Sequence, residues 1–212
     1  MLSKFIPTEM RKNLAKKIVS LFAWTGVTPN MLTLLAIPLA IIAAYFIAAG
    51  QFTFALIFIF LSVFIDALDG SLAELTNKKT PFGNYLDAMT DKIVESIIYI
   101  GFAFIQPIAA ILALSGTMLI AYAKPRAALV VETDNRDWPA IGERGDRLIV
   151  LIVGMLVAVF VPEIYGFSTI LITLALVAAI TWIGAVQRLL YGKALIEEGE
   201  KKGKILNYLK KK

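Results

Sequence analysis

Apolar residues along this chain gather into long continuous runs, and most polar residues collect between them. A helix needs roughly 20 apolar residues to cross the hydrocarbon core of a bilayer. Runs of about this length lie at residues 31–49, 52–72, 84–105, 107–127, 147–162 and 167–189. Because lipid offers the backbone no hydrogen bonds, continuous apolar runs favour helices over a barrel. The pattern therefore predicts an all-α integral membrane protein with six transmembrane helices.

A different pattern precedes the first run. From Met10 to Phe22 apolar residues recur at helical spacing, with lysines and arginine between them. This predicts an amphipathic helix over residues 7–25 that lies on the membrane surface. We place residues 31–190 in a six-helix core and residues 191–212 in a basic cytoplasmic tail, so that the 212 residues form one membrane domain.

The charges indicate how the helices thread the membrane. When the N-terminus is placed in the cytoplasm, all 21 lysines and arginines fall on the cytoplasmic half of the chain. The loops on the opposite side then carry Glu163 as their one charge. This asymmetry is typical of proteins of the cell membrane with both termini in the cytoplasm. The net charge of +5 thus indicates topology and contact with anionic lipid, and we expect no nucleic-acid partner.

The composition restricts the available chemistry. The chain has no cysteine and no histidine, which excludes disulfides, thiol catalysis and the commonest general base. Any proton transfer must therefore use a carboxylate, a lysine, a tyrosine or water.

Four aspartates are the strongest functional signal. Asp66 and Asp69 end the second run, and Asp87 and Asp91 open the third. Residues three or four apart share a helix face, and an antiparallel hairpin can make the two acidic faces meet. Carboxylates near hydrocarbon are expensive and usually functional. Oxygen ligands of this kind suit Mg²⁺, Mn²⁺ or Ca²⁺, so we expect a divalent metal site that faces the cytoplasm.

Two glycines accompany the aspartates. Gly70 follows Asp69 directly and Gly83 lies one turn before Asp87, where a bare backbone allows a ligand to approach closely. The structural alternative is that the glycines only pack helices and that the acids pair with nearby lysines.

A cation transporter is the alternative from another functional class. Asp66 lies 14 residues past Phe52, which is about 21 Å along a helix and beyond the bilayer midplane. A transporter more often binds its substrate near the midplane, between repeated halves. Between Phe52 and Ile65 the only polar residues are Thr53 and Ser62, which argues against a continuous cation path.

The acidic motif resembles the signature of the CDP-alcohol phosphotransferases. It reads Asp66-x₂-Asp69-Gly70-x₂-Ala73, followed by Gly83-x₃-Asp87-x₃-Asp91. The resemblance implies a membrane enzyme with six transmembrane helices and two divalent cations, Mg²⁺ or Mn²⁺. Such an enzyme transfers a phosphatidyl-type group from a CDP-linked lipid to an alcohol and releases CMP. It also implies a homodimer.

The resemblance assigns roles by position. The metal ligands are then Asp66, Asp69, Asp87 and Asp91. Asp91 would also act as the general base. The nucleotide contacts would be Gly70, Ala73 and Gly83.

One residue departs from the family pattern. The family usually has arginine after the alanine of the first half, and this chain has Glu74. Lys78 or Lys79 would then have to supply the missing positive charge near the nucleotide. Glu74 also leaves open a non-catalytic homologue that binds metal without releasing CMP.

Basic residues near three helix ends suggest the acceptor. Lys124, Arg144 and Arg188 resemble the residues with which the phosphatidylinositol-phosphate and archaetidylinositol-phosphate synthases bind the phosphate of inositol phosphate. The alternative without a binding function is that these long side chains only extend to the membrane interface. Lys92, directly after Asp91, is instead common in phosphatidylglycerophosphate synthases. We therefore expect a phosphorylated polyol as acceptor, inositol phosphate first and glycerol 3-phosphate as the alternative.

Overall fold

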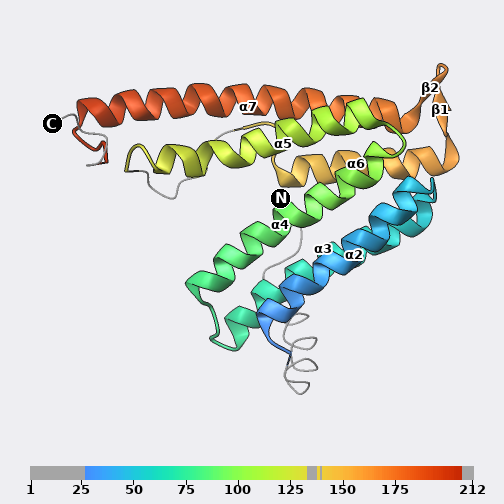
Figure 1. Ribbon diagram of the computed structural model, residues 1–212, viewed down its shortest axis with the longest axis horizontal. Helices are drawn as coiled ribbons and strands as arrows, with labels where there is room; N and C mark the ends of the chain where they lie inside the picture. The colour runs from blue at the N-terminus through green and yellow to red at the C-terminus, as the bar shows by residue number, and fades with distance from the viewer. Residues whose placement is uncertain (1–26, 133–137, 139, 207–212) are drawn as a thin grey trace, which may run out of the picture. The chain divides into compact units, whose positions relative to one another are not determined.

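The protein is described by a computed structural model over residues 27–132, 138 and 140–206. The predicted amphipathic helix at residues 7–25 and the last residues of the tail lie outside these ranges. Helices and one short hairpin follow each other along the described chain (Figure 1). In order, these elements are α2 (Pro29–Ala48), α3 (Phe52–Leu75), α4 (Pro81–Ala103), α5 (Pro107–Ala128), α6 (Arg144–Phe160), β1 (Glu163–Ile164), β2 (Phe167–Ser168) and α7 (Thr169–Lys201).

Each predicted span overlaps one of these helices. By length and composition, α2, α3, α5 and α7 can cross a membrane. Among the described residues, α4 and α6 are not both long enough and apolar enough to count as spans by the same criteria. Helix α4 carries four charged residues between Asp87 and Glu95, and α6 has only 17 residues. Four apolar helices support an integral membrane protein, and the full set of six spans stays a prediction.

Helix α7 is longer than the sequence pattern predicted. We expected the span to end at residue 189 and a tail to begin at residue 191, but the helix continues to Lys201. Its polar part contains Lys193 and Glu197, whose charged groups lie 3.7 Å apart one turn from each other. Such pairs support a helix where apolar packing ends.

The expected start of that span also differs. Residues 167–168 form strand β2 and pair with β1 in an antiparallel hairpin. Tyr165 and Gly166 connect the strands with φ of 52° and 79°. Positive φ at both central residues is the backbone of a tight two-residue hairpin, so the helix begins only at Thr169.

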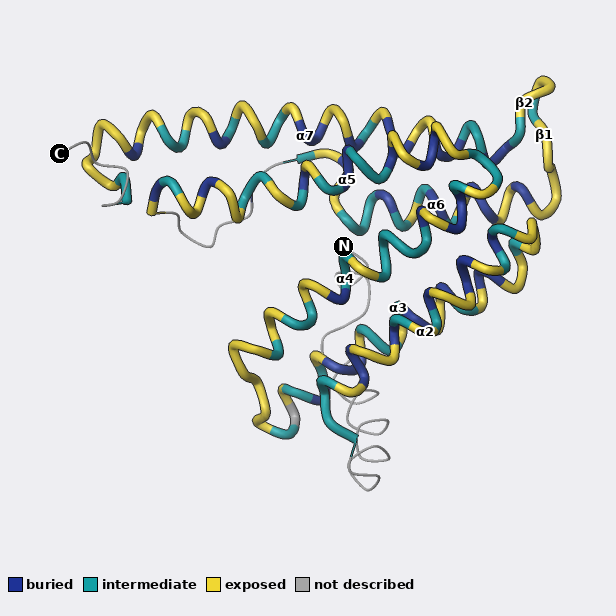
Figure 2. Tube along the Cα trace, viewed as in Figure 1, coloured by how far each residue is buried: buried dark blue, intermediate teal, exposed yellow. Residues whose placement is uncertain are grey.

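The chain divides into two compact units, Met1–Pro107 and Ile108–Lys212. In the first unit α2 packs against both α3 and α4. Its buried face consists mainly of small side chains, and Figure 2 shows buried positions recurring along it. A Cβ added at Gly101 in α4 would lie 2.7 Å from the Cα of Ala44 in α2. Small residues thus bring these two backbones close together, as is usual between membrane helices.

In the second unit, α5 and α6 are held against α7. Gly154 in α6 contacts Thr173, and Gly116 in α5 contacts Thr181. The indole Nε1 of Trp182 donates a hydrogen bond to the carbonyl of Leu112 at 3.1 Å. These contacts hold α5 and α6 against the same helix, α7.

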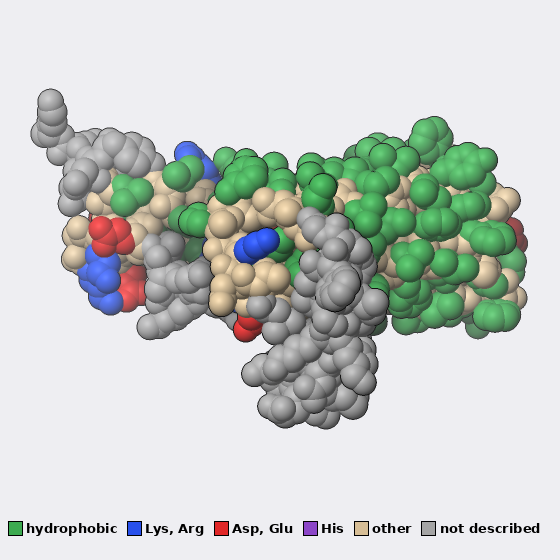
Figure 3. Space-filling model, turned by 90° about the horizontal axis from the view of Figure 1, so that it is seen from below, with side chains coloured by type: hydrophobic (Ala, Val, Ile, Leu, Met, Phe, Trp, Pro, Cys, Tyr) green, Lys and Arg blue, Asp and Glu red, His purple; other side chains and the backbone are tan. Residues whose placement is uncertain are grey.

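Large hydrophobic side chains cover much of the outer surface. Phe104 and Phe160 are 77% and 81% exposed. Figure 3 shows a broad area of hydrophobic side chains on one face. Exposed apolar areas of this extent are what a lipid-facing surface requires.

Candidate functional site

Helices α2 and α4 begin in the same way. Each has threonine at the N-cap and proline directly after it, a favourable start because proline needs no hydrogen-bond acceptor there. The hydroxyl of Thr28 accepts a hydrogen bond from the amide of Met31 at 3.3 Å. That of Thr80 accepts one from the amide of Gly83 at 2.9 Å. Both helix starts lie beside the acidic residues.

The structure brings three of the four predicted aspartates together. Asp66 and Asp69 of α3 and Asp87 of α4 each offer a carboxylate oxygen, and these oxygens lie within 4.8 Å of one another. Asp69 is 5% exposed, and the other two are half-buried. This confirms that the two acidic helix faces meet. Asp91 lies one turn after Asp87 in α4. It is not part of this group of three carboxylates, and its Oδ1 atom is buried.

Thr33 of α2 is a site residue that the sequence analysis missed. Its hydroxyl donates a hydrogen bond to Oδ2 of Asp69 at 2.5 Å, and the carbonyl of Pro29, at 3.1 Å, is the alternative acceptor. The bond orients a buried carboxylate from a third helix. The available signal was a hydroxyl one turn after Pro29 in an otherwise apolar run.

A pocket of about 260 Å³ opens beside the carboxylates. Helices α2, α3 and α4 and the α3–α4 connection all contribute to its wall. Its lining is Pro29, Asn30, Thr33, Asp69, Gly70, Ala73, Lys78, Lys79, Thr80, Gly83, Asn84 and Asp87. The three residues predicted to contact the nucleotide are therefore all in the wall of this pocket.

Two glycines shape the pocket in different ways. A Cβ added at Gly70 would meet no atom within 4 Å, so the missing side chain leaves open space. A Cβ added at Gly83 would lie 3.1 Å from the hydroxyl oxygen of Thr80. Gly70 therefore keeps the pocket empty, whereas Gly83 allows the cap of α4 to close tightly.

Lys78 and Lys79 also line the pocket, next to the position where the family usually has arginine. The ammonium of Lys79 lies 3.6 Å from the carboxylate of Glu74. Both side chains are about two-thirds exposed, at 67% and 69%, so their pairing is weak. The two lysines are thus placed to provide positive charge that Glu74 does not.

The donor set fits a divalent cation. Three carboxylates this close repel one another unless positive charge lies between them. All three offer oxygen, the ligand type that Mg²⁺ and Mn²⁺ prefer. The combined presence of a buried acid, an orienting hydroxyl and an open pocket matches such an ion better than a set of solvated surface acids.

The predicted acceptor residues all lie in the second unit. Lys124 is in the last turns of α5, Arg144 is the first residue of α6, and Arg188 is in α7. The guanidinium of Arg188 donates hydrogen bonds to the carbonyl of Ile120 and to the carboxylate of Glu143, both at 2.9 Å. The convergence of the three cations on one phosphate stays a prediction.

Gly184 holds the segment before α6 against α7. A Cβ at this position would overlap the carbonyl oxygen of Ile141. We expect Gly184→Ala to lower the free energy of unfolding by about 1–3 kcal/mol, the usual effect of overpacking, in a thermal-unfolding measurement in detergent. Gly192→Ala is the matched control, because its Cβ would meet Trp138 at an ordinary 3.5 Å. Equal stabilities of the two variants would contradict this packing.

Comparison with known proteins places the chain among relatives of one family. Residues 26–186 match the model of the CDP-alcohol phosphatidyltransferase family. The archaetidylinositol phosphate synthase of Pyrococcus horikoshii is 31% identical, over 94% of this chain and 100% of the relative. That of Aeropyrum pernix is 30% identical, over 84% of this chain and 89% of the relative.

A solved structure shares the fold. The phosphatidylinositol phosphate synthase PgsA1 of Mycobacterium tuberculosis, crystallised with CDP-DAG bound, superposes with a TM-score of 0.72 at 26% identity. The match covers 85% of this chain and 94% of that chain. Family, relatives and structure agree on a transferase and do not support the transporter alternative. The chain belongs to the CDP-alcohol phosphatidyltransferase family.

Proposed function

We propose that this protein transfers a phosphatidyl-type group from a CDP-linked lipid to a hydroxyl of inositol phosphate and releases CMP. The observation that carries the proposal is the pocket itself. Gly70, Ala73 and Gly83 of the family motif line the same pocket as Asp69 and Asp87. The archaeal relatives named above favour inositol phosphate as the acceptor.

The pocket suits the pyrophosphate of the donor. The N-termini of α2 and α4 border it, and Lys78 and Lys79 add positive charge. Helix N-termini favour anions because their first amides lack partners within the helix. With Gly70 leaving open space, the nucleotide end of a CDP-linked lipid would fit beside the carboxylates.

We assign the divalent ions, two of them by family resemblance, to Asp66, Asp69, Asp87 and Asp91. When bound, Mg²⁺ or Mn²⁺ neutralises the negative charge of the pyrophosphate and of the leaving CMP. Thr33 holds Asp69 in position through its hydroxyl. The combined negative charge of these carboxylates attracts cations to the pocket even without substrate, because a bound cation relieves their mutual repulsion.

Asp91 is the proposed general base. Its carboxylate accepts the proton of the acceptor hydroxyl while that oxygen bonds to the lipid-side phosphorus. The bond between this phosphorus and the bridging oxygen breaks, and the bridging oxygen leaves with CMP. Lys124, Arg144 and Arg188 are the proposed ligands of the acceptor's phosphate.

The membrane arrangement is part of the proposal. Six spans, with both termini and the acidic pocket on the cytoplasmic side, account for the distribution of lysine and arginine. We also propose that the protein forms a homodimer in the membrane, as the family resemblance implies.

The test is CMP release by the purified protein with Mg²⁺ and either diacyl or archaeol CDP-lipid. We expect release with inositol phosphate and little with glycerol 3-phosphate, free inositol or serine. Asp91→Asn should reduce the rate by roughly 10²–10⁴-fold, the usual contribution of a general base.

Each contrary outcome has a definite meaning. Release with glycerol 3-phosphate alone would assign the protein to the phosphatidylglycerophosphate synthases. The absence of release with every acceptor and both donors would contradict the proposed function and favour a non-catalytic homologue with Glu74 in place of arginine.

A further inference from the structure

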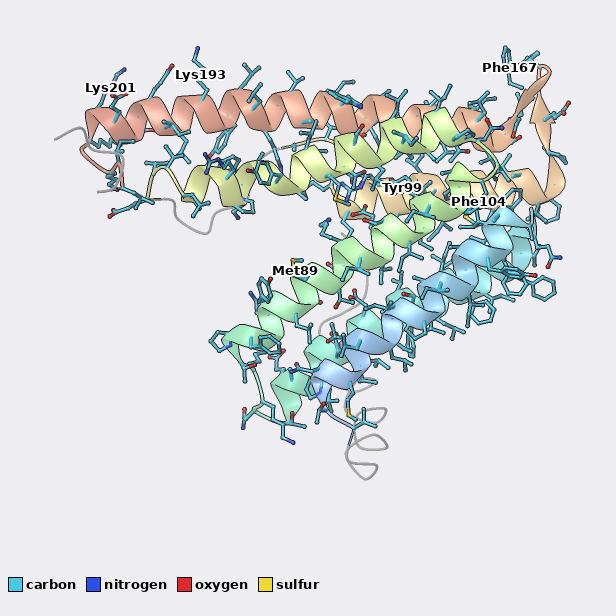
Figure 4. All side chains as sticks on the ribbon, in the orientation of Figure 1. Met89, Tyr99, Phe104, Phe167, Lys193 and Lys201 are labelled. Atoms are coloured by element: carbon cyan, nitrogen blue, oxygen red, sulfur yellow. The ribbon has the colours of Figure 1, made fainter. Side chains whose placement is uncertain are left out.

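Arg188 is anchored on one side of its guanidinium. Its Nη1 donates to the carbonyl of Ile120 in α5 at 2.9 Å. The side chain is only 13% exposed. By contrast, Lys193, five residues further along α7, projects outward and is 70% exposed (Figure 4). Arg188 is therefore a fixed cation inside the second unit and not a snorkelling one.

The other edge of the guanidinium is only half used. Nη2 donates to Oε1 of Glu143 at 2.9 Å, while Nε is buried and has no hydrogen-bond partner among the described residues. Nε and Nη2 together form the edge that binds carboxylates and phosphates with two parallel hydrogen bonds. An incoming phosphate would find this edge occupied by Glu143 at one of its two positions.

The backbone places Glu143 at this position. The amide of Ile141 donates to the side chain of Gln187 at 2.9 Å. The carbonyl of Gly142 accepts a hydrogen bond from buried Arg147 at 2.5 Å. Gly142 has φ of +76°, and a Cβ there would lie 2.9 Å from the carbonyl oxygen of Ile180. Only glycine readily adopts this conformation so close to α7.

Within the ion pair the acid is the more exposed partner. Glu143 is also the N-cap of α6, where its side chain accepts a hydrogen bond from the backbone amide of Asp146 and its own amide donates to the side chain of Asp146. Displacement by a phosphate would therefore break only its contact with Arg188. The side chain of Glu143 is 50% exposed, against 13% for Arg188. A half-exposed carboxylate can exchange its partner for water at little cost, whereas a buried guanidinium cannot.

We propose that Glu143 is the resident counter-ion of Arg188, which the acceptor's phosphate displaces from the Nε–Nη2 edge. Glu143 thereby weakens acceptor binding and sets the acceptor concentration that the enzyme needs. This rests on the proposed function, in which Arg188 binds the acceptor phosphate. The proposal goes beyond that function by assigning to Glu143 an effect on acceptor affinity that requires no contact with the reacting atoms.

Two variants separate competition from positioning. Glu143→Gln removes the negative charge but keeps a hydrogen-bond acceptor for Arg188 and for the amide of Asp146 at the start of α6. Glu143→Ala removes the charge and both acceptors. If Glu143 competes with the phosphate, both variants should lower the KM for inositol phosphate by about threefold, with kcat changed less than that. A raised KM in Glu143→Ala together with an unchanged KM in Glu143→Gln would show that Glu143 positions Arg188, and would overturn the proposal.

Glu198→Gln is the matched control. Glu198 also lies on the surface, is 59% exposed, and pairs with Lys202 near the end of α7. Its KM should equal that of the wild type. An equal fall in KM in this control would indicate a general charge effect and would contradict a specific role of Glu143.

A binding measurement keeps this inference separate from the proposed function. Inorganic phosphate should protect Glu143→Gln from thermal unfolding at a lower concentration than it protects the wild type. This result needs no turnover, so it stands or falls independently of CMP release. Equal half-saturating phosphate concentrations for the two proteins would overturn the displacement of Glu143.

Discussion

Asp69→Asn is expected to reduce CMP release by at least about 10²-fold while the protein stays folded. Asp69 is the buried member of the three carboxylates, and its partners lie on two helices. Asparagine keeps an oxygen that can accept the hydrogen bond from Thr33 but removes the negative charge. The measurement is the initial rate of CMP release at saturating Mg²⁺.

Thermal unfolding gives a second readout for the same variant. A ligand that binds only the folded state at 100 times its Kd stabilises it by about 2.7 kcal/mol. We expect Mn²⁺ to stabilise the wild type and to have little effect on Asp69→Asn. In EDTA the variant should be at least as stable as the wild type, because one of three mutually repelling charges is gone.

Glu163→Gln serves as the control for this experiment. Glu163 is an exposed acid in β1, in the second unit, and its loss removes the same charge. It should leave both CMP release and the Mn²⁺ effect unchanged. If Asp69→Asn retains the stabilisation by Mn²⁺, the three carboxylates do not form the metal site.

Gly70→Leu is expected to abolish donor binding without unfolding the protein. Gly70 lines the pocket, and a Cβ there would meet no protein atom within 4 Å. A leucine would therefore extend into pocket space and not into a neighbouring helix. Since small displacements of bound substrate can cost about 10²-fold in rate, we expect at least that loss in kcat/KM for the CDP-lipid.

The stability of Gly70→Leu should not fall, because a glycine in a helix interior costs up to about 1 kcal/mol relative to good helix formers. Ala67→Leu is the matched control on α3, since Ala67 is also exposed but is not part of the pocket wall. Protection by CMP against thermal unfolding should be lost only in Gly70→Leu. Equal protection of both variants would place the nucleotide elsewhere.

The sequence by itself determined the helices and the acidic pairs. Apolar runs, and aspartates three and four residues apart, are periodic signals that depend on backbone geometry alone. The short connection between α3 and α4 then made it predictable that Asp69 and Asp87 would meet. Glycine beside each pair was equally local, and the structure places both glycines in the pocket wall.

The length of α7 was only partly determined by the sequence. Hydropathy marks where a helix leaves the hydrocarbon, but not where it stops. Beyond residue 189 the helix continues through charged residues, where pairs such as Lys193 and Glu197 support it. The apolar pattern could therefore give the start of the polar segment but not its conformation.

Only the tertiary structure decided the contacts between distant residues. Thr33 and Asp69 are 36 positions apart, and Arg188 and Glu143 are 45 positions apart. These contacts depend on which helix faces pack together and how closely, and close approach requires small residues such as Gly101 and Gly184. In the sequence, Thr33 is a lone hydroxyl and Glu143 a lone acid. Only the packing of the helices determines that Thr33 orients Asp69 and that Glu143 pairs with Arg188.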